Sequence, residues 1–548
     1  MFRKPLRLLF ALALLFPLLA GAVTVRAEVG EMGFFGGISD GTKLPKTTET
    51  ILQKTGNTNN RNRNTRRTFF YTEVIFLSGV PREFNGILEI SSPGPGTADE
   101  GTYTETHRVY ASQYTNPAIA ISREIEYTVN YRRVDRQVIK DYTVSRKSAV
   151  NMERKWSEVI LVPEGAFTID PVLSSCGISI IEDHTPAVMY YRGDISMHAV
   201  YVSDSTEETG AGVANQAGTG VFVSEIDNGV TVADYMGSFH GYQCAWSNTE
   251  THRMDVLVQN KAWQMQYQIR PSVSVNKTLQ YTENEPLAIS FEGNYKEVLQ
   301  NVSGLRYDIF VKPRMYPDME TAGQAAINTQ NTFEQLIAPD LNFLKGHPAE
   351  DDIKKLFSMQ VLDGDPKFYQ PAQAVTRGQF VTALVKAIKL PIEEQTAVAP
   401  RNRRNAQAQQ PIVFPDVTPN RPEYPYIMAA YRHGLALGRD FGNFFTDYSM
   451  ERQEAIVILL RTLGLQNLGL DPTPLTAFTD DAQIGDWAKR EMSAAYRLGI
   501  IGPDEEGRIR PKELVTKAEA AAFVNHLIEY MRNGLAVDYA DNIVNYPN

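Results

Sequence analysis

The chain has 548 residues, too many for one hydrophobic core, so we expect two or three domains. Its 54 Lys and Arg residues stand against 64 Asp and Glu residues, a formal charge of −10 at pH 7 that argues against a nucleic-acid-binding protein. An apolar fraction of 43% supplies enough material for packed cores.

The N-terminus has the pattern of a secretory signal peptide. Arg3, Lys4 and Arg7 supply the positive charge, and residues 8–19 form an apolar run that is short for a membrane span. Small residues follow, and we expect cleavage after Ala27, which makes 1–27 the signal peptide. The sequence therefore predicts an exported protein with no membrane span after cleavage.

Residues 28–66 are rich in Thr, Asn and Arg and are predicted to be a flexible lead-in. Residues 67–313 have the pattern of β-strands. In one segment Ile125, Tyr127 and Val129 alternate with polar residues, the period of two that a half-buried strand requires. Turn residues separate many such segments, which favours one or two antiparallel β-sandwiches.

Residues 314–344 are predicted to be a helical connector, because Ala322, Ala326, Phe333 and Ile337 recur at helical spacing. The two cysteines are Cys176 and Cys244. In an exported protein they form either a disulfide or two buried free thiols, and the sequence leaves both outcomes open.

The last two fifths of the chain repeat one plan three times: a helix, a loop with glycine, and a second helix. The third copy runs from Phe478 to Phe523. Its Thr516-Lys517-Ala518-Glu519 tetrad is a capping box, in which the hydroxyl and the carboxylate each satisfy a backbone donor. Such repeats bury their apolar faces by packing on one another. We predict the following segments: repeats at 345–390, 413–466 and 467–532, a flexible insert at 391–412, and a tail at 533–548.

These marks together resemble S-layer homology (SLH) repeats. The family opens on Phe-x-Asp, carries a Trp in the first helix, brackets its loop with glycines and closes on Thr-Arg-Ala-Glu. The fold class that follows is α+β, with an antiparallel β-sandwich-like region before a helical three-repeat SLH module. The resemblance implies a cell-surface protein anchored non-covalently to the wall through an acidic, pyruvylated secondary cell-wall polysaccharide. Self-association in a surface layer is a second expectation about partners.

Each tetrad places a cation directly after the helix N-cap, beside backbone N–H groups and the positive helix end, where an anion binds. Arg suits a carboxylate with two parallel bonds, whereas Lys supplies charge only. From the resemblance we expect acidic side chains to accept sugar hydroxyls, an indole to stack on a sugar, and loop glycines to let backbone approach the ligand. The predicted polysaccharide-binding residues are Arg377, Arg452, Lys517, Asp416, Asp480, Trp487, Gly364, Gly438 and Gly502.

The alternative is that the cations are ordinary exposed first-turn charges and that Trp487 belongs to the core. The repeats also depart from the family pattern. The first lacks Phe-x-Asp and has Gly378 in its tetrad, and the second has Glu451 where Thr is usual, so that Ser449 is another candidate cap. The third repeat follows the family most closely.

The β region has no motif that indicates catalysis, and we predict no catalytic residue, no metal and no cofactor. The cluster of Glu182, Asp183 and His184 with His240 and Cys244 fits no zinc spacing. The first hypothesis is a structural or adhesive module without enzymatic activity. The alternatives are a wall-anchored polysaccharide hydrolase, which needs two opposed carboxylates in a cleft, and a carbohydrate-binding module, which would show exposed aromatic residues in a row.

Overall fold

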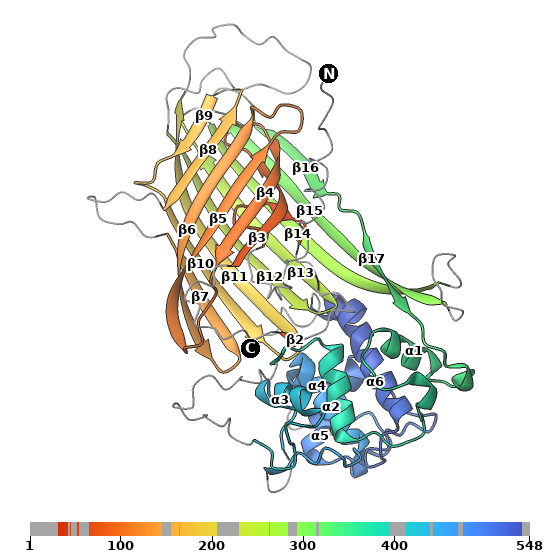
Figure 1. Ribbon diagram of the computed structural model, residues 1–548. Coiled ribbons are helices and arrows are strands. Elements are labelled where there is room, and N and C mark those ends of the chain that lie inside the picture. Colours follow the sequence, from red (N-terminus) through yellow and green to blue (C-terminus); the bar gives the residue numbers. More distant parts are fainter. Residues whose placement is uncertain are drawn as a thin grey trace, which may run out of the picture.

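The computed structural model describes residues 31–41, 44, 52–53, 65–144, 155–163, 165–204, 230–261, 263–282, 293–313, 317–393, 413–438, 442–469 and 475–539. In these residues a large antiparallel β region precedes a helical region, as the sequence predicts (Figure 1). The predicted signal peptide and nearly all of the insert at 391–412 lie outside the described residues. None of the described helices is both long and apolar enough to cross a bilayer.

The β region is one sheet of 16 strands, and every neighbouring pair in it is antiparallel. Its main order is β1-β3-β4-β5-β6-β7-β10-β11-β12-β13-β14-β15-β16, with β8, β9 and β17 joined at the side. The strands are β1 (Ile38–Ser39), β3 (Thr65–Ile75), β4 (Arg82–Ser92), β5 (Glu100–Ser112), β6 (Ala120–Val134), β7 (Gln137–Thr143), β8 (Trp156–Val162), β9 (Gly165–Ile169), β10 (Ser175–His184), β11 (Val188–Asp204), β12 (Val230–Cys244), β13 (Ser247–Gln259), β14 (Trp263–Thr282), β15 (Asn294–Pro313), β16 (Met319–Ile327) and β17 (Thr332–Ile337). A separate parallel pair joins β2 (Leu52–Gln53) to β18 (Ile392–Glu393).

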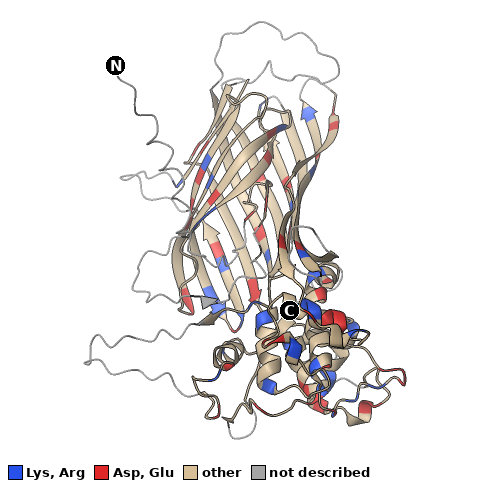
Figure 2. Ribbon diagram, turned by 45° about the vertical axis from the view of Figure 1, so that its right-hand side comes forward, with Lys and Arg blue, Asp and Glu red and all other residues tan. Residues whose placement is uncertain are grey.

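The sheet curls until β16 lies beside β3, so strands from both ends of the sheet share one core. The alternation along β6 shows why: Ile121, Ile125 and Tyr127 are buried, whereas Glu124 and Asn130 face outward. This confirms the predicted period of two. Figure 2 shows acidic and basic residues spread along the strands and over the helices.

An N-terminal segment fills the inside of the curled sheet. Residues 31–41 are almost entirely buried. The prediction of a flexible lead-in is therefore wrong for this segment. Phe34 stacks on His107 of β5 with ring centroids 5.4 Å apart, and Phe35 lies under the guanidinium of Arg123 at 3.8 Å. The physical reason is a short apolar cluster, Met32 to Ile38, that the polar composition around it conceals.

The interior also holds paired charges. The Arg123 guanidinium bridges Glu73, at 2.8 Å, and Glu158, at 2.5 Å, and the hydroxyls of Tyr71 and Tyr201 complete the network. Burial raises the pKa of Glu158, against the charge of Arg123. A buried carboxylate without a partner would cost several kcal/mol (on the order of 3–5), which explains why these groups occur together.

The predicted helical connector at 314–344 is wrong for its larger part, because residues 319–327 and 332–337 form β16 and β17. Both strands pair with β15, whose 20 residues offer an edge long enough for two partners in series. The Ala-rich sequence is compatible with helical spacing, and the long-range pairing overrides that local preference.

The helical region contains two helices per repeat. Its α-helices are α1 (Glu350–Ser358), α2 (Arg377–Ala387), α3 (Tyr424–Arg432), α4 (Arg452–Leu463), α5 (Asp486–Arg497), α6 (Lys517–Glu529) and α7 (Leu535–Asp538), with one π-helical turn (Tyr530–Gly534) and 3-10 turns at Asn342–Leu344, Pro366–Phe368, Gln466–Leu468 and Asp481–Gln483. The hydroxyls of Thr376 and Thr516 accept the third amide of α2 and α6, each at 3.2 Å, as predicted. Glu451 is the N-cap residue of α4, and its amide donates to Glu454 at 3.3 Å, so the suggested cap at Ser449 is wrong. The chain past 532 is not all tail: the helix continues to Asp538, and Tyr539 is buried.

The C-terminal ends of three helices rest against one end of the sheet (Figure 1). Sheet donors satisfy carbonyl groups there. The Trp246 indole bonds to Ala387 of α2 at 2.8 Å, the Ala187 amide bonds to Thr462 of α4 at 2.8 Å, and the Ser247 hydroxyl bonds to Met531 after α6 at 2.5 Å. Because the last carbonyls of a helix need external partners, these contacts join the two regions in one packed unit.

The two cysteines are buried free thiols, so the disulfide alternative is wrong. Cys176 pairs with Met197 of β11, and Cys244 pairs with Val188 of the same strand. Nine residues of extended strand separate those partners, roughly 30 Å at strand spacing. A disulfide needs Cα atoms within about 7 Å, and the rigid sheet keeps these two far apart.

Candidate polysaccharide site between the repeats

The three repeats close on one another around a ring of backbone hydrogen bonds. The amide of Val375 donates to Val515, that of Val515 to Met450, and that of Met450 to Val375, at 2.9, 2.9 and 3.4 Å. Each of these residues comes just before a closing tetrad. The ring brings the N-terminal ends of α2, α4 and α6 together. The C-terminal ends of the same helices contact the sheet.

The first two amides of each second helix bond to the neighbouring repeat. Arg377 and Gly378 donate to Tyr448 and Thr446, and the other two repeats do the same in cyclic order: Arg452 and Gln453 to Glu513 and Pro511, and Lys517 and Ala518 to Gln373 and Pro371, all at 2.8–3.0 Å. The expectation that free backbone N–H groups receive an anion here is therefore corrected. These amides hold the repeats together, and only side chains remain to meet a ligand.

The two predicted arginines use their guanidinium groups between repeats. Arg377 is buried, donates to the carbonyl oxygen of Leu437 at 2.8 Å and lies over the ring of Phe444 at 5.0 Å. Arg452 donates to the carbonyl oxygen of Ile509 at 2.9 Å and pairs with Glu519. Both side chains thus reach from one repeat into the next, and removing either would break protein contacts.

Lys517 differs from the two arginines. Its backbone joins the third repeat to the first, where the Tyr369 hydroxyl donates to the Lys517 carbonyl oxygen at 2.8 Å. Within the described part of the chain, its ammonium group makes no ion pair and no hydrogen bond, and the side chain is half-buried. Next to Tyr369, Phe368 exposes 79% of its surface. The junction of the third and first repeats therefore carries both a cation and an accessible ring.

The two predicted aspartates are clamps for the loop before the tetrad. The oxygens of Asp416 accept the amides of Phe444 and Phe445 at 2.8 and 2.6 Å. Those of Asp480 accept the amides of Ile509 and Arg510 at 3.0 and 2.7 Å. Phe445 and Arg510 have positive φ values of 61° and 53°, which are strained for these residue types. The carboxylates stabilise these loops, and both of their oxygens are occupied by protein donors.

Trp487 lies on the surface with 54% of its area exposed, so the core alternative for this residue is wrong. It starts α5 beside Gly485, whose amide is held by Gln453 of α4 at 3.0 Å. The indole therefore lies at the junction of the second and third repeats. There it is open to stack on a flat apolar face.

The loop glycines fall into two groups. Gly364 has φ of +95° and open space where a Cβ would be, and Gly502 also faces open space. Gly438 packs against the ring of Phe414, which a Cβ would approach to 2.9 Å. Two of the three glycines thus leave room for a ligand near the backbone, and the third serves packing.

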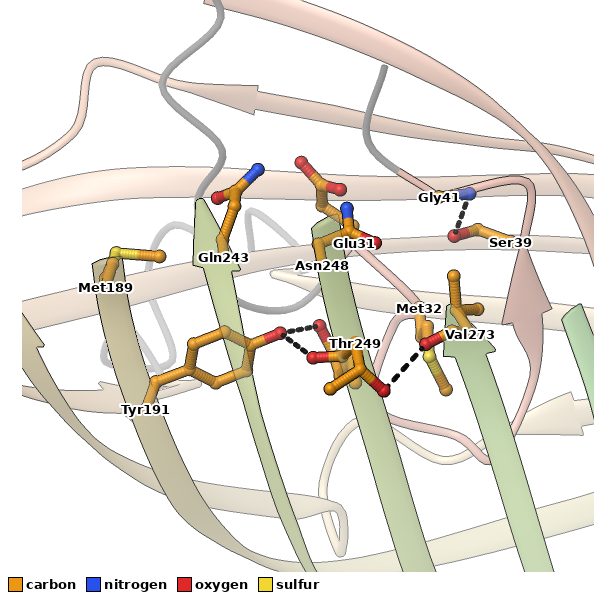
Figure 3. Close-up of a pocket in the computed structure, with 11 residues that line it drawn as sticks. Glu31, Met32, Ser39, Gly41, Met189, Tyr191, Gln243, Asn248, Thr249 and Val273 are labelled. Atoms are coloured by element: carbon orange, nitrogen blue, oxygen red, sulfur yellow. Dashed lines mark hydrogen bonds between the residues drawn. The ribbon is translucent and has the colours of Figure 1, made fainter. Parts of the chain in front are cut away.

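Residues of the candidate metal cluster in the β region, which contains Glu182, are bonded to other protein groups. Glu182 pairs with Lys140 at 2.5 Å and with His184 at 2.9 Å, Asp183 pairs with Arg136, and Cys244 bonds to Ser247. No group of three metal-ligating side chains is present among the residues that the structure describes. A small cavity of about 20 Å³ lies nearby between the N-terminal segment and β11–β14, lined by Glu31, Tyr191 and Asn248 (Figure 3). Such a volume holds one water molecule rather than a substrate.

The residues predicted from the sequence do not include Phe368 and Tyr369, which lie at the junction of the third and first repeats with Lys517. Both come shortly before Pro371 and the first tetrad, in a stretch that the sequence shows plainly. The carbonyl groups that receive the tetrad amides carry no sequence signal, because a carbonyl oxygen is present at every residue.

Comparison with known proteins identifies the three repeats. The model of the S-layer homology domain matches residues 344–381, 413–456 and 477–521. No family model matches the region before them. The chain is 30% identical over 199 residues to exoglucanase XynX of Acetivibrio thermocellus, which covers 35% of this chain and 16% of the exoglucanase. It is 28% identical over 199 residues to the amylopullulanase of Thermoanaerobacterium thermosulfurigenes, covering 35% and 10% of the two chains.

The chain is also 26% identical over 179 residues to the S-layer protein of Bacillus thuringiensis subsp. finitimus, covering 32% and 20% of the two chains. It thus spans a fifth or less of the length of these relatives, which share the repeats and not the β region. The C-terminal portion of this chain consists of three S-layer homology domains, and they indicate a protein of the cell wall or cell surface.

Proposed function

We propose that the protein binds an acidic, pyruvylated secondary wall polysaccharide through the grooves between its repeats and so displays the β region at the cell surface. The observation that carries the proposal is the position of Lys517 at the junction of the third and first repeats, where its ammonium group has no ion-pair partner among the described residues. A ketal carboxylate would supply the missing anion, and the exposed ring of Phe368 would meet the sugar.

The junction of the second and third repeats contributes by contact rather than by charge. At the junction of the second and third repeats Trp487 offers its indole, while the nearby Arg452 is already paired with Glu519. Several weak sites on one rigid unit bind a repeating polymer with avidity, because the second binding event becomes intramolecular.

We also propose that the β region acts without catalysis, as a structural or adhesive module. The proposal is supported by three buried carboxylates that form ion pairs with basic side chains. Glu73 and Glu158 bond to Arg123, and Glu182 bonds to Lys140. A hydrolase of polysaccharides needs two opposed carboxylates with room between them for the substrate, and these groups are packed against cations instead.

The test is co-sedimentation of the full-length protein with cell walls. Wild-type protein, Lys517→Ala and the control Lys312→Ala, which removes the same charge from an exposed position on β15, are compared on intact walls, on walls stripped of the secondary polymer and on walls whose polymer lacks pyruvate. We expect binding to need the pyruvylated polymer and to weaken about tenfold in Lys517→Ala only. Equal binding of Lys517→Ala and wild type, or binding to stripped walls, would disprove the proposal.

A further inference from the structure

A row of exposed apolar side chains crosses the outer face of the sheet, away from the repeats. Strand pairing places Phe70 of β3 directly opposite Ile87 of β4, and Ile87 opposite Tyr110 of β5. These side chains expose 66%, 36% and 46% of their surface. The row continues through Ser122 of β6 to Val159 of β8. Exposed aromatic groups in a contiguous line mark an interaction site more often than scattered ones do.

A second row runs parallel to the first, two residues along each strand, and it is mainly polar. Thr72 lies opposite Asn85, Asn85 opposite Ser112, Ser112 opposite Ala120, and Ala120 opposite Leu161. The Thr72 hydroxyl donates to the Asn85 carbonyl oxygen at 2.7 Å, and the Asn85 amide donates to Glu83 at 3.0 Å. These two bonds fix the orientation of the Asn85 side-chain amide. Within the described part of the chain, they use one of its two N–H hydrogens.

Between the two rows lies a groove whose floor is the backbone of Gly86, Ala111 and Ile121. Two hollows occupy it, of about 770 and 430 Å³, and both are lined by Asn85 and Gly86. Gly86 is paired with Tyr71 and Ala111, which face the core, and a Cβ at this position would meet the Tyr110 carbonyl oxygen at 2.0 Å. Glycine therefore allows the backbones of β4 and β5 to approach closely under the groove. The larger hollow extends past β3 to Asn301, Asn328 and Gln330.

The chemistry of the groove restricts its occupant. Of the residues that line the two hollows, only Asp40 carries a charge, so the groove does not select an ionic ligand. The floor strands β4, β5 and β6 are each paired on both sides, and a peptide cannot join them as an added strand. The ligand must be read by side chains, through ring stacking on one wall and hydroxyl or amide bonds on the other.

We propose that this groove binds a neutral polysaccharide chain. Sugars present an apolar face, which suits Phe70 and Tyr110, and a rim of hydroxyls, which suits Asn85 and Ser112. The two rings stand two strands apart, about 10 Å by strand spacing, so an extended chain laid across the strands meets both. This site is separate from the grooves between the repeats, where the proposed ligand is acidic, and it makes the protein a link between two polymers.

The experiment is affinity electrophoresis of the full-length protein in native gels that contain mixed-linkage β-glucan, xylan, glucomannan or amylopectin, with polygalacturonate as an acidic comparison. The variants are Phe70→Ala/Tyr110→Ala and the control Phe333→Ala, an aromatic residue with 68% exposure that lines neither hollow. Wall co-sedimentation of the same proteins shows whether the repeats remain active.

We expect at least one neutral polymer to retard wild-type protein and Phe333→Ala equally, and the double variant to bind at least about tenfold more weakly. All three proteins should sediment equally with walls, because the repeats are unchanged. Retardation by none of the neutral polymers, retardation by polygalacturonate alone, or equal retardation of the double variant would each overturn the proposal.

Discussion

The indole nitrogen of Trp246, in the turn between β12 and β13, donates a 2.8 Å hydrogen bond to the carbonyl oxygen of Ala387, the last residue of α2. The ring is fully buried, and the guanidinium of Arg532 lies over it at 4.5 Å. One side chain of the sheet thus reaches the ends of the first and third repeats. The β region and the SLH domains therefore share a core.

Replacing Trp246 with alanine should separate the two regions energetically. We expect a loss of about 3–5 kcal/mol, because the substitution removes a buried ring and leaves a cavity. Calorimetry should show one transition for the wild type and two for Trp246→Ala. The control is Trp487→Ala, whose exposed ring should change stability by less than about 0.5 kcal/mol. A single, unshifted transition in Trp246→Ala would contradict a shared core.

Asp480→Ala should destabilise the third repeat rather than remove a ligand contact. The carboxylate accepts the amides of Ile509 and Arg510, and hydrogen bonds to a charged group contribute about 1.5–3 kcal/mol each. We expect a loss of about 2–4 kcal/mol in urea unfolding. Asp486→Ala, whose side chain is fully exposed, serves as the control. Unchanged stability with lost wall binding would instead assign the carboxylate to the sugar.

Acid should weaken the protein through Glu182. Burial alone would raise the pKa of this carboxyl group, but the charge of Lys140 and the hydrogen bond with His184 lower it to about 2. Since this folded-state value is below that of an unfolded glutamate, about 4.3, the stabilisation is present above pH 4.3 and is lost as the pH falls toward 2. Urea midpoints between pH 7 and 2 should fall less steeply in Glu182→Gln than in the wild type.

The same variant should be less stable at pH 7, since it leaves the buried Lys140 without its carboxylate. Glu124→Gln, at an exposed position on β6, should retain the wild-type pH profile. Parallel profiles for the wild type and Glu182→Gln would refute the role of Glu182.

The thiols should be silent in the native protein. Burial raises the pKa of Cys176 to about 12, and burial also raises the pKa of Cys244, so both remain protonated at pH 8 and inaccessible. Titration with a disulfide reagent should find no reactive thiol before unfolding and two afterwards, and reductant should leave the melting temperature unchanged. No thiol after unfolding would indicate a disulfide.

Local patterns were sufficient for part of this structure. The capping boxes at Thr376 and Thr516, the alternation along β6 and the three repeats follow from residues close together in the sequence. Features that depend on distant partners were not accessible. β16 and β17 form because β15 offers them an edge. Residues 31–41 are buried because strands that come later in the sequence form the core around them.

The candidate site shows the same limit. The position of Lys517 could be predicted from its tetrad, whereas the bond from Arg377 to Leu437 and the clamps at Asp416 and Asp480 required the neighbouring loops in place. An acidic residue that accepts backbone amides and one that accepts sugar hydroxyls look identical in a sequence.

The bonds among Val375, Met450 and Val515 form a cycle, in which the third repeat returns to the first. An open stack of repeats has two ends and can gain or lose copies there. A cycle has no ends, and a fourth copy would have to break a bond before it could enter. The number of junctions between repeats is thus fixed at three by geometry. Because no further repeat can be added to the cycle, the affinity for the polymer can change only through substitutions at the existing junctions.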